Sequence, residues 1–282
     1  MITKIVTAPV CLPVSLAEAK KHLRVTFDED DALIRRMISS AVLYCEQYTV
    51  RKFITQTWKQ YFDVWPTQII PFFGDLQSVT HIKYTDTDAT QSTFSNTLYG
   101  VDTNSVPGRV VLNYQQTWPD DDLAPLNPIE VQFVTGYPYN LVIQDAVFDG
   151  VGLDDVETGG TYTGTAPALY EVEIQTSATP DTFRWRKNGG TWTSSVAITG
   201  AAQTLDLGVT VTFSATTGHT VGEKWEFFAG NSVPEDIRTA IFIMIAHYYE
   251  NRELYLIGTI GALYPKSVDA HLYNHRIWEW CL

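Results

Sequence analysis

The sequence is organised around residues 232–254, which read SVPEDIRTAIFIMIAHYYENREL. Apolar residues recur there at steps of three and four, a spacing that places them on one face of a helix: Ile237, Ala240, Ile241, Met244 and Tyr248. Ser232 and Glu235 have the spacing of a capping box, with Pro234 in the first turn, which predicts where the helix begins. Other apolar residues fill the remaining sides. We therefore expect a core helix that is covered on several sides and is too short for a membrane span.

Composition limits the classes of protein that the chain can form. With 282 residues, of which 45% are hydrophobic, it can bury a large core and is expected to make two domains. A formal net charge of −13 argues against a surface that grips nucleic acid, because phosphate binding needs clustered Lys and Arg. Cys11, Cys45 and Cys281 show no paired spacing, which indicates reduced thiols and assembly in the cytoplasm. The N-terminal apolar run is interrupted by prolines, so we expect no signal peptide or transmembrane segment.

Two more helices are predicted near the N-terminus. Ser15 and Glu18 form a second capping-box spacing, ahead of a short helix. A longer helix is expected over residues 28–49, with the acidic run Asp28–Asp31 at its start. These carboxylates suit the positive end of the helix dipole, and they lack the glycine turn of a calcium loop. Helix capping is therefore favoured over a cation site.

Two stretches have the alternation of β-strands. Residues 58–135 contain short β-branched and aromatic segments that are divided by turn residues. Residues 140–165 are rich in Gly, Asp and Thr, which predicts a boundary or linker. A second β-rich block follows up to residue 230, with Asn188-Gly189 as a hairpin signal, and its size suits a small β-sandwich.

The order of several short motifs carries a resemblance. They are Ser15-Leu16-Ala17-Glu18-Ala19-Lys20 with His22-Leu23-Arg24, Asp30-Asp31, Leu33-Ile34, Glu46-Gln47-Tyr48, Gln56-Thr57-Trp58, Thr135-Gly136-Tyr137, Val233-Pro234 and Ala246-His247-Tyr248-Tyr249-Glu250-Asn251-Arg252-Glu253. Together they resemble the head-to-tail connector (adaptor) family of tailed double-stranded-DNA bacteriophages, over about residues 10–139 and 232–278. Members of that family usually cross from the Gly-Tyr segment to the Val-Pro segment by a short loop, whereas here about 90 residues intervene.

The resemblance implies a small helical bundle with a β-element between its helices. The intervening residues depart from the family and are interpreted as an inserted all-β sandwich-like domain, so the expected fold class is α+β. The expected domains are 1–139 with 232–282 as a discontinuous connector core, and 140–231 as the insert with its Gly/Asp/Thr-rich lead-in. The family implies a homo-oligomeric ring, commonly of twelve subunits, that joins the portal protein to a stopper or tail-completion protein in the virion neck. The genome would pass through the ring without sequence-specific binding. No catalysis, cofactor or membrane is implied.

Two sets of residues are candidates for contacts. The aromatic C-terminal segment is expected to dock on the portal, because apolar ends with one Arg suit an interface hot spot; it contains Leu272, Arg276, Ile277, Trp278 and Trp280. Deletion of residues 268–282 is accordingly expected to leave a folded monomer that no longer joins the portal. The end of the core helix is expected to contact a neighbouring subunit through Tyr249, Glu250, Arg252 and Glu253.

Other patterns were weighed against structural explanations. His271 and His275 have the spacing of a metal pair on a helix, but no third ligand is close in sequence, so no metal is expected. The chain contains no Gly-x-Ser-x-Gly, His-Glu-x-x-His or Walker motif, which argues against an enzyme. An alternative function is a tail-associated adhesion or carbohydrate-binding β-protein, in which Trp185, Trp192 and Trp225 present flat faces to sugars. Their positions within alternating strands favour a place in the sandwich core instead.

Overall fold

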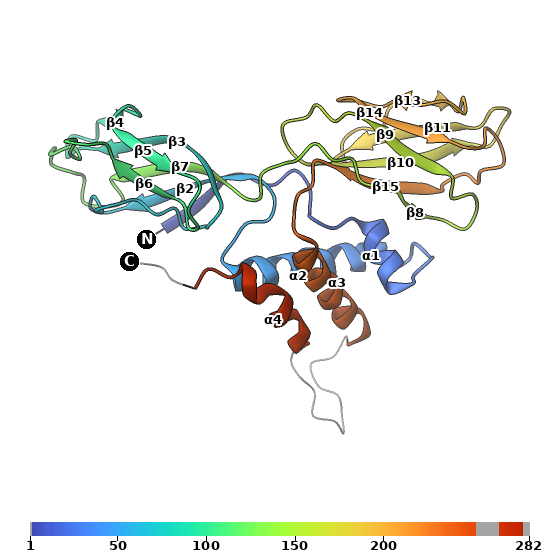
Figure 1. The fold of residues 1–282 in the computed structure, drawn as a ribbon, viewed down its shortest axis with the longest axis horizontal. Coiled ribbons are helices and arrows are strands. Elements are labelled where there is room, and N and C mark those ends of the chain that lie inside the picture. Colours follow the sequence, from blue (N-terminus) through green and yellow to red (C-terminus); the bar gives the residue numbers. More distant parts are fainter. Residues whose placement is uncertain (1, 252–264, 279–282) are drawn as a thin grey trace, which may run out of the picture. The chain divides into compact units, whose positions relative to one another are not determined.

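The computed structural model of the protein describes residues 2–251 and 265–278. Within these ranges the chain forms four α-helices, a short 3₁₀ helix and fifteen strands, all of whose pairings are antiparallel (Figure 1). The predicted α+β class, helices combined with a β-element and a second all-β part, is confirmed. The chain divides into two compact units: unit 1 is Met1–Pro9, Thr49–Pro138 and Arg276–Leu282, and unit 2 is Val10–Tyr48 and Tyr139–His275.

Unit 1 is built on a five-stranded sheet with the order β1-β2-β7-β3-β4. Its strands are β1 (Ile2–Thr7), β2 (Gln56–Phe62), β3 (Leu76–Thr85), β4 (Gln91–Phe94) and β7 (Ile129–Thr135), and β5 (Tyr99–Asp102) pairs with β6 (Arg109–Leu112) in a second, two-stranded sheet. The central strand β7 alternates as the sequence predicts, and its Ile129, Val131 and Phe133 are fully buried. The N-terminal segment pairs with β2 as an edge strand. Residues 67–73 contribute a single bridge from Ile69 to Val110.

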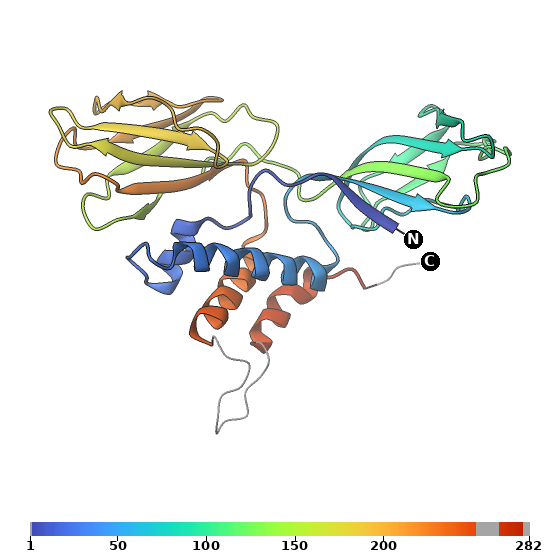
Figure 2. The ribbon, with the colours of Figure 1, turned by 180° about the vertical axis from the view of Figure 1, so that it is seen from behind.

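The helices of unit 2 form one group (Figure 2). They are α1 (Leu16–Leu23), α2 (Asp31–Thr49, whose last residue belongs to unit 1), α3 (Glu235–Glu250) and α4 (Lys266–Leu272), which continues into the 3₁₀ turn η1 (Tyr273–His275). The capping box of α1 is confirmed, because the Glu18 N–H donates to the Ser15 hydroxyl and the Ser15 N–H donates to the Glu18 carboxylate. The predicted capping box of α3 is wrong. That helix begins at Glu235 with Pro234 as its N-cap residue, and the Pro234 carbonyl accepts from the first-turn amides.

The rest of unit 2 is a β-sandwich. One sheet has the order β12-β11-β10-β15-β8 and the other β13-β14-β9. The strands are β8 (Val147–Asp149), β9 (Val156–Gly160), β10 (Ala168–Thr176), β11 (Thr182–Lys187), β12 (Val196–Ala197), β13 (Gln203–Thr204), β14 (Val209–Phe213) and β15 (Lys224–Ala229). Alternate residues of β10, β14 and β15 fill the core between the sheets, as period-two patterning requires. Asn188 and Gly189, both at positive φ, form the predicted turn after β11.

Two expectations about the boundaries need comment. The Gly/Asp/Thr-rich segment 140–165 is more than a linker, because it supplies β8 and β9, one to each sheet of the sandwich. The compact units also follow different boundaries from the predicted domains, since unit 2 holds the helices together with residues 140–231. The division into a connector core and an insert therefore stays a prediction about domains.

Candidate assembly surfaces

Residues 276–278 of unit 1 are fixed by a socket for Ile277, which consists of Thr49, Gly74 and Val106. The Ile277 N–H donates to the Thr49 carbonyl at 3.1 Å, and the Ile277 side chain lies directly over Gly74, beside Val106. A Cβ at position 74 would come within 1.9 Å of the Ile277 Cδ1, so a larger residue there would force the Ile277 side chain to move. Ile277 is 7% exposed, whereas the next residue, Trp278, is 55% exposed. The socket thus fixes the segment and leaves the indole accessible.

A pocket of about 590 Å³ adjoins this segment. Among the residues that the structure describes, its lining combines apolar side chains with three arginines and contains no carboxylate: Arg51, Gln68, Ile70, Ser105, Val106, Pro107, Arg109, Arg276, Ile277 and Trp278. The guanidinium of Arg276 lies over the Trp278 ring, 4.6 Å from its centroid, in a cation–π arrangement. Arg51 is paired with Asp75, and Arg109 with Asp102 at 3.1 Å. Large apolar area beside guanidinium groups is the composition of an interface hot spot.

The other predicted portal-docking residues are not all at this surface. Leu272 lies on α4 in unit 2, is fully buried, and belongs to a helix that packs against α3. Trp280 lies outside the described residues. Of the predicted set, Arg276 and Trp278 therefore line the pocket directly, Ile277 anchors them, and Leu272 is covered by its own chain. Their docking on a portal remains a prediction.

The end of α3 makes contacts within the chain. The Tyr249 hydroxyl donates to the Asp30 carboxylate at 2.7 Å, which ties α3 to the residue before α2. Glu250 is exposed at the last position of the helix. Arg252 and Glu253, the other predicted subunit contacts, lie outside the described residues. Glu250 is thus the accessible member of the described part of this set.

A buried lysine joins α1, α2 and the sandwich. The Lys20 side chain is 1% exposed, and its ammonium lies 2.7 Å from Asp28, 3.1 Å from Asp31 and 2.8 Å from Asp149 of β8. Burial alone opposes the charged form, but the hydrogen bonds to the three carboxylates outweigh it and raise the pKa of Lys20. The acidic run, interpreted from sequence as helix capping, therefore also binds a cation, and that cation is the protein's own lysine.

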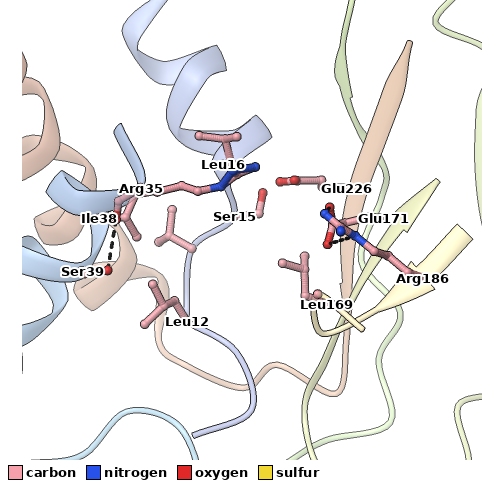
Figure 3. A pocket seen from close by; sticks show the side chains of 12 residues that line it. Leu12, Ser15, Leu16, Arg35, Ile38, Ser39, Leu169, Glu171, Arg186 and Glu226 are labelled. Atoms are coloured by element: carbon pink, nitrogen blue, oxygen red, sulfur yellow. Dashed lines mark hydrogen bonds and ion pairs between the residues drawn. The ribbon is translucent and has the colours of Figure 1, made fainter. Parts of the chain in front are cut away.

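A second set of polar contacts joins the first turn of α1 to the sandwich (Figure 3). The Ala17 N–H donates to the Glu226 carboxylate of β15 at 2.8 Å, so a side chain of the sandwich caps the N-terminus of α1. Burial raises the pKa of Glu226, against the effect of the Ala17 N–H. On the next strand, Glu171 accepts two hydrogen bonds from Arg186 at 2.9 and 2.5 Å. These groups line a pocket of about 440 Å³ with apolar residues of α1, α2 and the preceding segment, such as Leu12.

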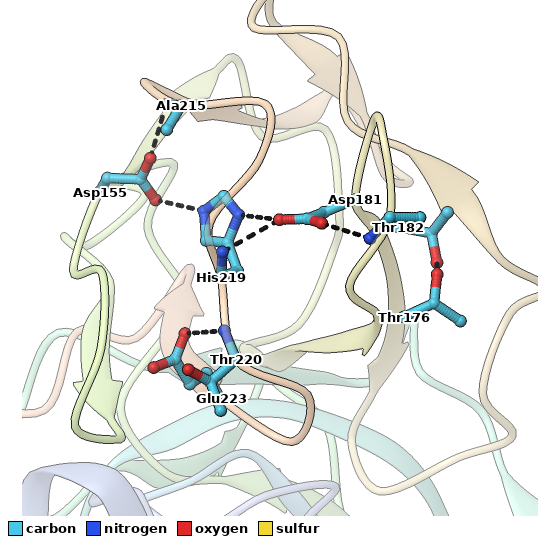
Figure 4. A network of polar contacts seen from close by, with 9 residues as sticks. Asp155, Thr176, Asp181, Thr182, Ala215, His219, Thr220 and Glu223 are labelled. Carbon is cyan, nitrogen blue, oxygen red and sulfur yellow. Dashed lines mark hydrogen bonds and ion pairs between the residues drawn. The ribbon is translucent and has the colours of Figure 1, made fainter.

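The loop between β14 and β15 of the sandwich contains a buried imidazole, that of His219 (Figure 4). His219 has no exposed side-chain surface; its Nδ1 lies 2.9 Å from Asp181 and its Nε2 lies 3.1 Å from Asp155. Burial opposes the charged ring, but the two carboxylates outweigh it and raise the pKa of His219 above its ordinary value of 6.5. Because the folded pKa exceeds the unfolded one, this stabilisation is complete below about pH 6.5 and is lost as the pH rises through the folded pKa. His219 also meets Phe213 and Trp225 edge-on. The group stabilises the sandwich and is not open to a substrate.

The tryptophans of the second β-block occupy different environments. Trp225 is fully buried in the sandwich core, and Trp185 packs against that core beside Tyr170. Trp192 lies against two guanidinium groups, those of Arg184 and Arg186, at 4.6 and 4.4 Å from its ring centroid. The core interpretation is confirmed for Trp225, which presents no face to a sugar.

Metal and membrane features were also considered. His271 and His275 both lie near Asp236 of α3, at 3.9 and 3.8 Å. Within residues 2–251 and 265–278, no group of three or more His, Cys, Asp or Glu side chains is arranged to hold a metal ion. In the same ranges, no helix combines the length and the apolarity that a membrane span requires.

Comparison with known proteins identifies the class to which this architecture is similar. Residues 13–101 match the family model described as "Phage gp6-like head-tail connector protein". Three solved structures share the fold over 99% of this chain and 97% of their own, each with 14% sequence identity. They are the neck of an empty gene transfer agent particle computed with C6 symmetry (TM-score 0.57), the virion of a native gene transfer agent particle (0.54) and the neck of a native particle computed with C12 symmetry (0.54). No curated protein matches the sequence.

The predicted resemblance to head-to-tail connectors is thus confirmed for residues 13–101. The likeness in fold also includes the sandwich, because it extends over nearly the whole chain. Sequence reasoning missed Lys20, Glu226 and His219, whose partners lie far away in the sequence. For Lys20 the available signal was a lysine among the apolar positions of α1. Glu226 alternates with Lys224 and Phe228 in β15, and His219 lies in a loop, so neither carried a comparable signal.

Proposed function

We propose that this protein is a structural component of the neck of a tailed phage or phage-like particle, where identical copies form a ring. The observation that carries the proposal is the fold likeness over 99% of the chain to proteins of gene transfer agent particles, two of them neck structures computed with C6 and C12 symmetry. The match of residues 13–101 to the head-tail connector family supports it independently. A ring of twelve identical subunits has six-fold as well as twelve-fold symmetry, so twelve subunits agrees with both.

In this proposal the ring joins the portal to a stopper or tail-completion protein and extends the DNA exit channel. The portal contact is made by the C-terminal segment, with Trp278 as an accessible aromatic anchor and Arg276 stacked on it. Ile277 in its socket presents both side chains in a fixed arrangement, which reduces the entropy lost on docking. The chain is assembled in the host cytoplasm and acts in the virion, and no catalysis is involved.

The net charge of −13 suits a channel for DNA. A wall of carboxylates repels phosphate, so a duplex slides past without binding and no sequence is read. Mapping of the acidic residues in an assembled ring tests this part of the proposal. A lumen lined by Lys and Arg would contradict it.

Negative-stain electron microscopy of the purified chain, alone and mixed with portal rings, tests the main proposal. We expect rings that stack coaxially on the portal. Trp278→Ala is expected to leave the fold intact and to weaken portal attachment at least about tenfold, as loss of a hot-spot aromatic does; Trp192→Ala, which changes a tryptophan of unit 2, is the matched control. This comparison replaces deletion of residues 268–282, because Val268 and Leu272 are fully buried and their loss would damage unit 2. A chain that stays monomeric at high concentration and in the presence of portal would refute the proposal.

A further inference from the structure

Unit 1 carries opposite charges at the two ends of β3. The arginine-lined pocket adjoins the start of this strand: Asp75, the partner of Arg51, immediately precedes Leu76, and the Gly108 N–H donates to the Gly74 carbonyl at 3.1 Å. Four segments lie around the pocket: 50–55, 67–75, 102–109 and 276–278. They contain four basic residues, Arg51, Lys52, Arg109 and Arg276, and two acidic residues, Asp75 and Asp102. Within residues 2–251 and 265–278, no carboxylate lines the pocket itself. These segments thus carry a net positive charge in a chain that has 19 basic and 32 acidic residues.

The opposite end of β3 is strongly acidic. The Thr87 N–H donates to the Asp122 carbonyl at 3.1 Å, and Asp86 bridges to Leu123, so the loop 119–128 lies where the strand ends. Three loops lie at this end of the strand: 63–66, 86–90 and 119–128. They contain no Lys or Arg, and they contain six aspartates: Asp63, Asp86, Asp88, Asp120, Asp121 and Asp122. The last three are consecutive and exposed.

The acidic loop is also held in a fixed shape. Trp118, just before it, stacks on Trp65 with ring centroids 4.6 Å apart and planes 5° apart. The Trp118 indole N–H donates to the Pro66 carbonyl at 2.9 Å. A loop that is anchored in this way loses little conformational entropy when it binds. Pro119 and the aspartates after it therefore form a rigid, negatively charged projection.

Within one chain Arg51 pairs with Asp75 and Arg109 with Asp102, and neither of these aspartates belongs to the loop 119–122. β3 has ten residues, which at a rise of about 3.3 Å per residue places the ends about 30 Å apart. Screening in physiological salt acts over about 8 Å, which weakens attraction between carboxylates beyond the last residue of β3 and guanidinium groups before its first. A second copy brings the acidic loop to the basic pocket, and the contact joins two different patches of identical chains. Such a heterologous contact generates a ring when its rotation closes.

We propose that the acidic loop 119–122 of one subunit docks at the part of the arginine-lined pocket that Ile70, Pro107 and Arg109 form in the next subunit around the ring, and that Arg276 and Trp278 remain for the portal. The proposal rests on the ring proposed above and names the faces that form it. Arg109, whose side chain is 52% exposed, is the pocket guanidinium most accessible to an incoming carboxylate. The apolar lining, including Ile70 and Pro107, contacts the proline and the aliphatic parts of the loop. Charge then selects the orientation of the contact and speeds encounter, and the apolar area supplies most of the affinity.

A cross-linking experiment tests the contact in assembled rings. The doubly substituted chain Val106→Cys/Asp120→Cys is treated with a short bis-maleimide and analysed by denaturing electrophoresis. Val106 lines the pocket, lies beside Gly74 and is 52% exposed. We expect a ladder of covalent oligomers. A mixture of the two single variants should stop at dimers, because each chain then carries one half of the contact. The wild type and the single variants control for the native cysteines, such as the buried Cys45.

Charge reversal gives a second measurement. Asp120→Arg and Arg109→Asp are each expected to raise the concentration needed for ring formation at least about tenfold, and the two together in one chain to restore much of it. Asp145→Arg changes the charge by the same amount as Asp120→Arg on an exposed site of unit 2 and should have little effect. Rings that form without the ladder, or that lose only portal attachment in Arg109→Asp, overturn this contact and leave the proposed function standing. A wild-type chain that forms no rings overturns both.

Discussion

Replacement of Lys20 by methionine tests how the helices are joined to the sandwich. The substitution keeps a long unbranched side chain in place and removes the ammonium that lies between α1, α2 and β8. Lys21 is the next residue of the same helix and is exposed, so Lys21→Met is a matched control with the same change in charge and composition.

The expected magnitude follows from the exposure of the three carboxylates. Asp28 is 69% exposed, so water solvates it when its partner is lost and its share is small. Asp31 and Asp149 are 17% and 10% exposed, and they would be left close together without a counter-charge. Removal of one partner from a buried ion pair costs about 3–5 kcal/mol. Because the aspartates retain some contact with water, we expect a loss near the lower limit, about 3 kcal/mol, against less than about 0.5 kcal/mol for Lys21→Met.

Urea unfolding measures the difference. Far-UV circular dichroism follows the helices and tryptophan fluorescence follows the sandwich core, where Trp225 is fully buried. In thermal unfolding, a loss of about 3 kcal/mol corresponds to a decrease of about 6–12 °C in the Tm of a unit of this size. Asp149→Asn should cost less in the Lys20→Met background than in the wild type, with a coupling of about 1 kcal/mol or more.

Equal unfolding free energies for Lys20→Met and Lys21→Met would refute the reasoning. So would additive effects of Lys20→Met and Asp149→Asn, because additivity would mean that the ammonium and the β8 carboxylate do not stabilise each other. In either case the contact between α1 and the sandwich would depend on apolar packing alone.

The remaining predictions concern the C-terminal socket, the buried imidazole and assembly. Gly74→Ala should displace Ile277 and therefore speed tryptic cleavage after Arg276. Gly100→Ala is the control, because its new Cβ meets nothing closer than 3.5 Å, and it should leave the cleavage rate unchanged. Equal cleavage rates in the two variants would argue against the socket. His219→Gln should lower the urea midpoint most at acidic pH, and its difference from the wild type should shrink as the pH rises above about 6.5, because the raised pKa makes the charged ring the stabilising form. A constant difference from pH 6 to pH 9 would contradict the assignment. Ring formation should weaken as salt increases from about 0.05 to 0.5 M, measured by light scattering, since charges at the two ends of β3 guide the contact; no change would count against that contact.

Much of the fold follows from local patterns in the sequence. The apolar spacing in residues 232–254 predicted α3, and period-two alternation predicted strands such as β7 and β10. The Ser15–Glu18 capping box marked the start of α1 because its hydrogen bonds join residues three apart. Where local rules compete, the prediction was less accurate: Pro234 has no N–H and takes the N-cap position of α3, so Ser232 lies outside the cap.

The contacts that join distant segments were decided by the tertiary structure alone. Lys20 meets Asp149 across 129 positions, and Glu226 caps a helix that begins more than 200 residues earlier. The residues that line the arginine pocket come from four separate segments, and the charge difference between the ends of unit 1 exists only because β3 separates them. A sequence specifies its helices and strands through neighbours a few residues apart, since those interactions act before the chain is compact. Which buried charge finds a partner, and which faces remain for another subunit, depends on how the finished elements pack.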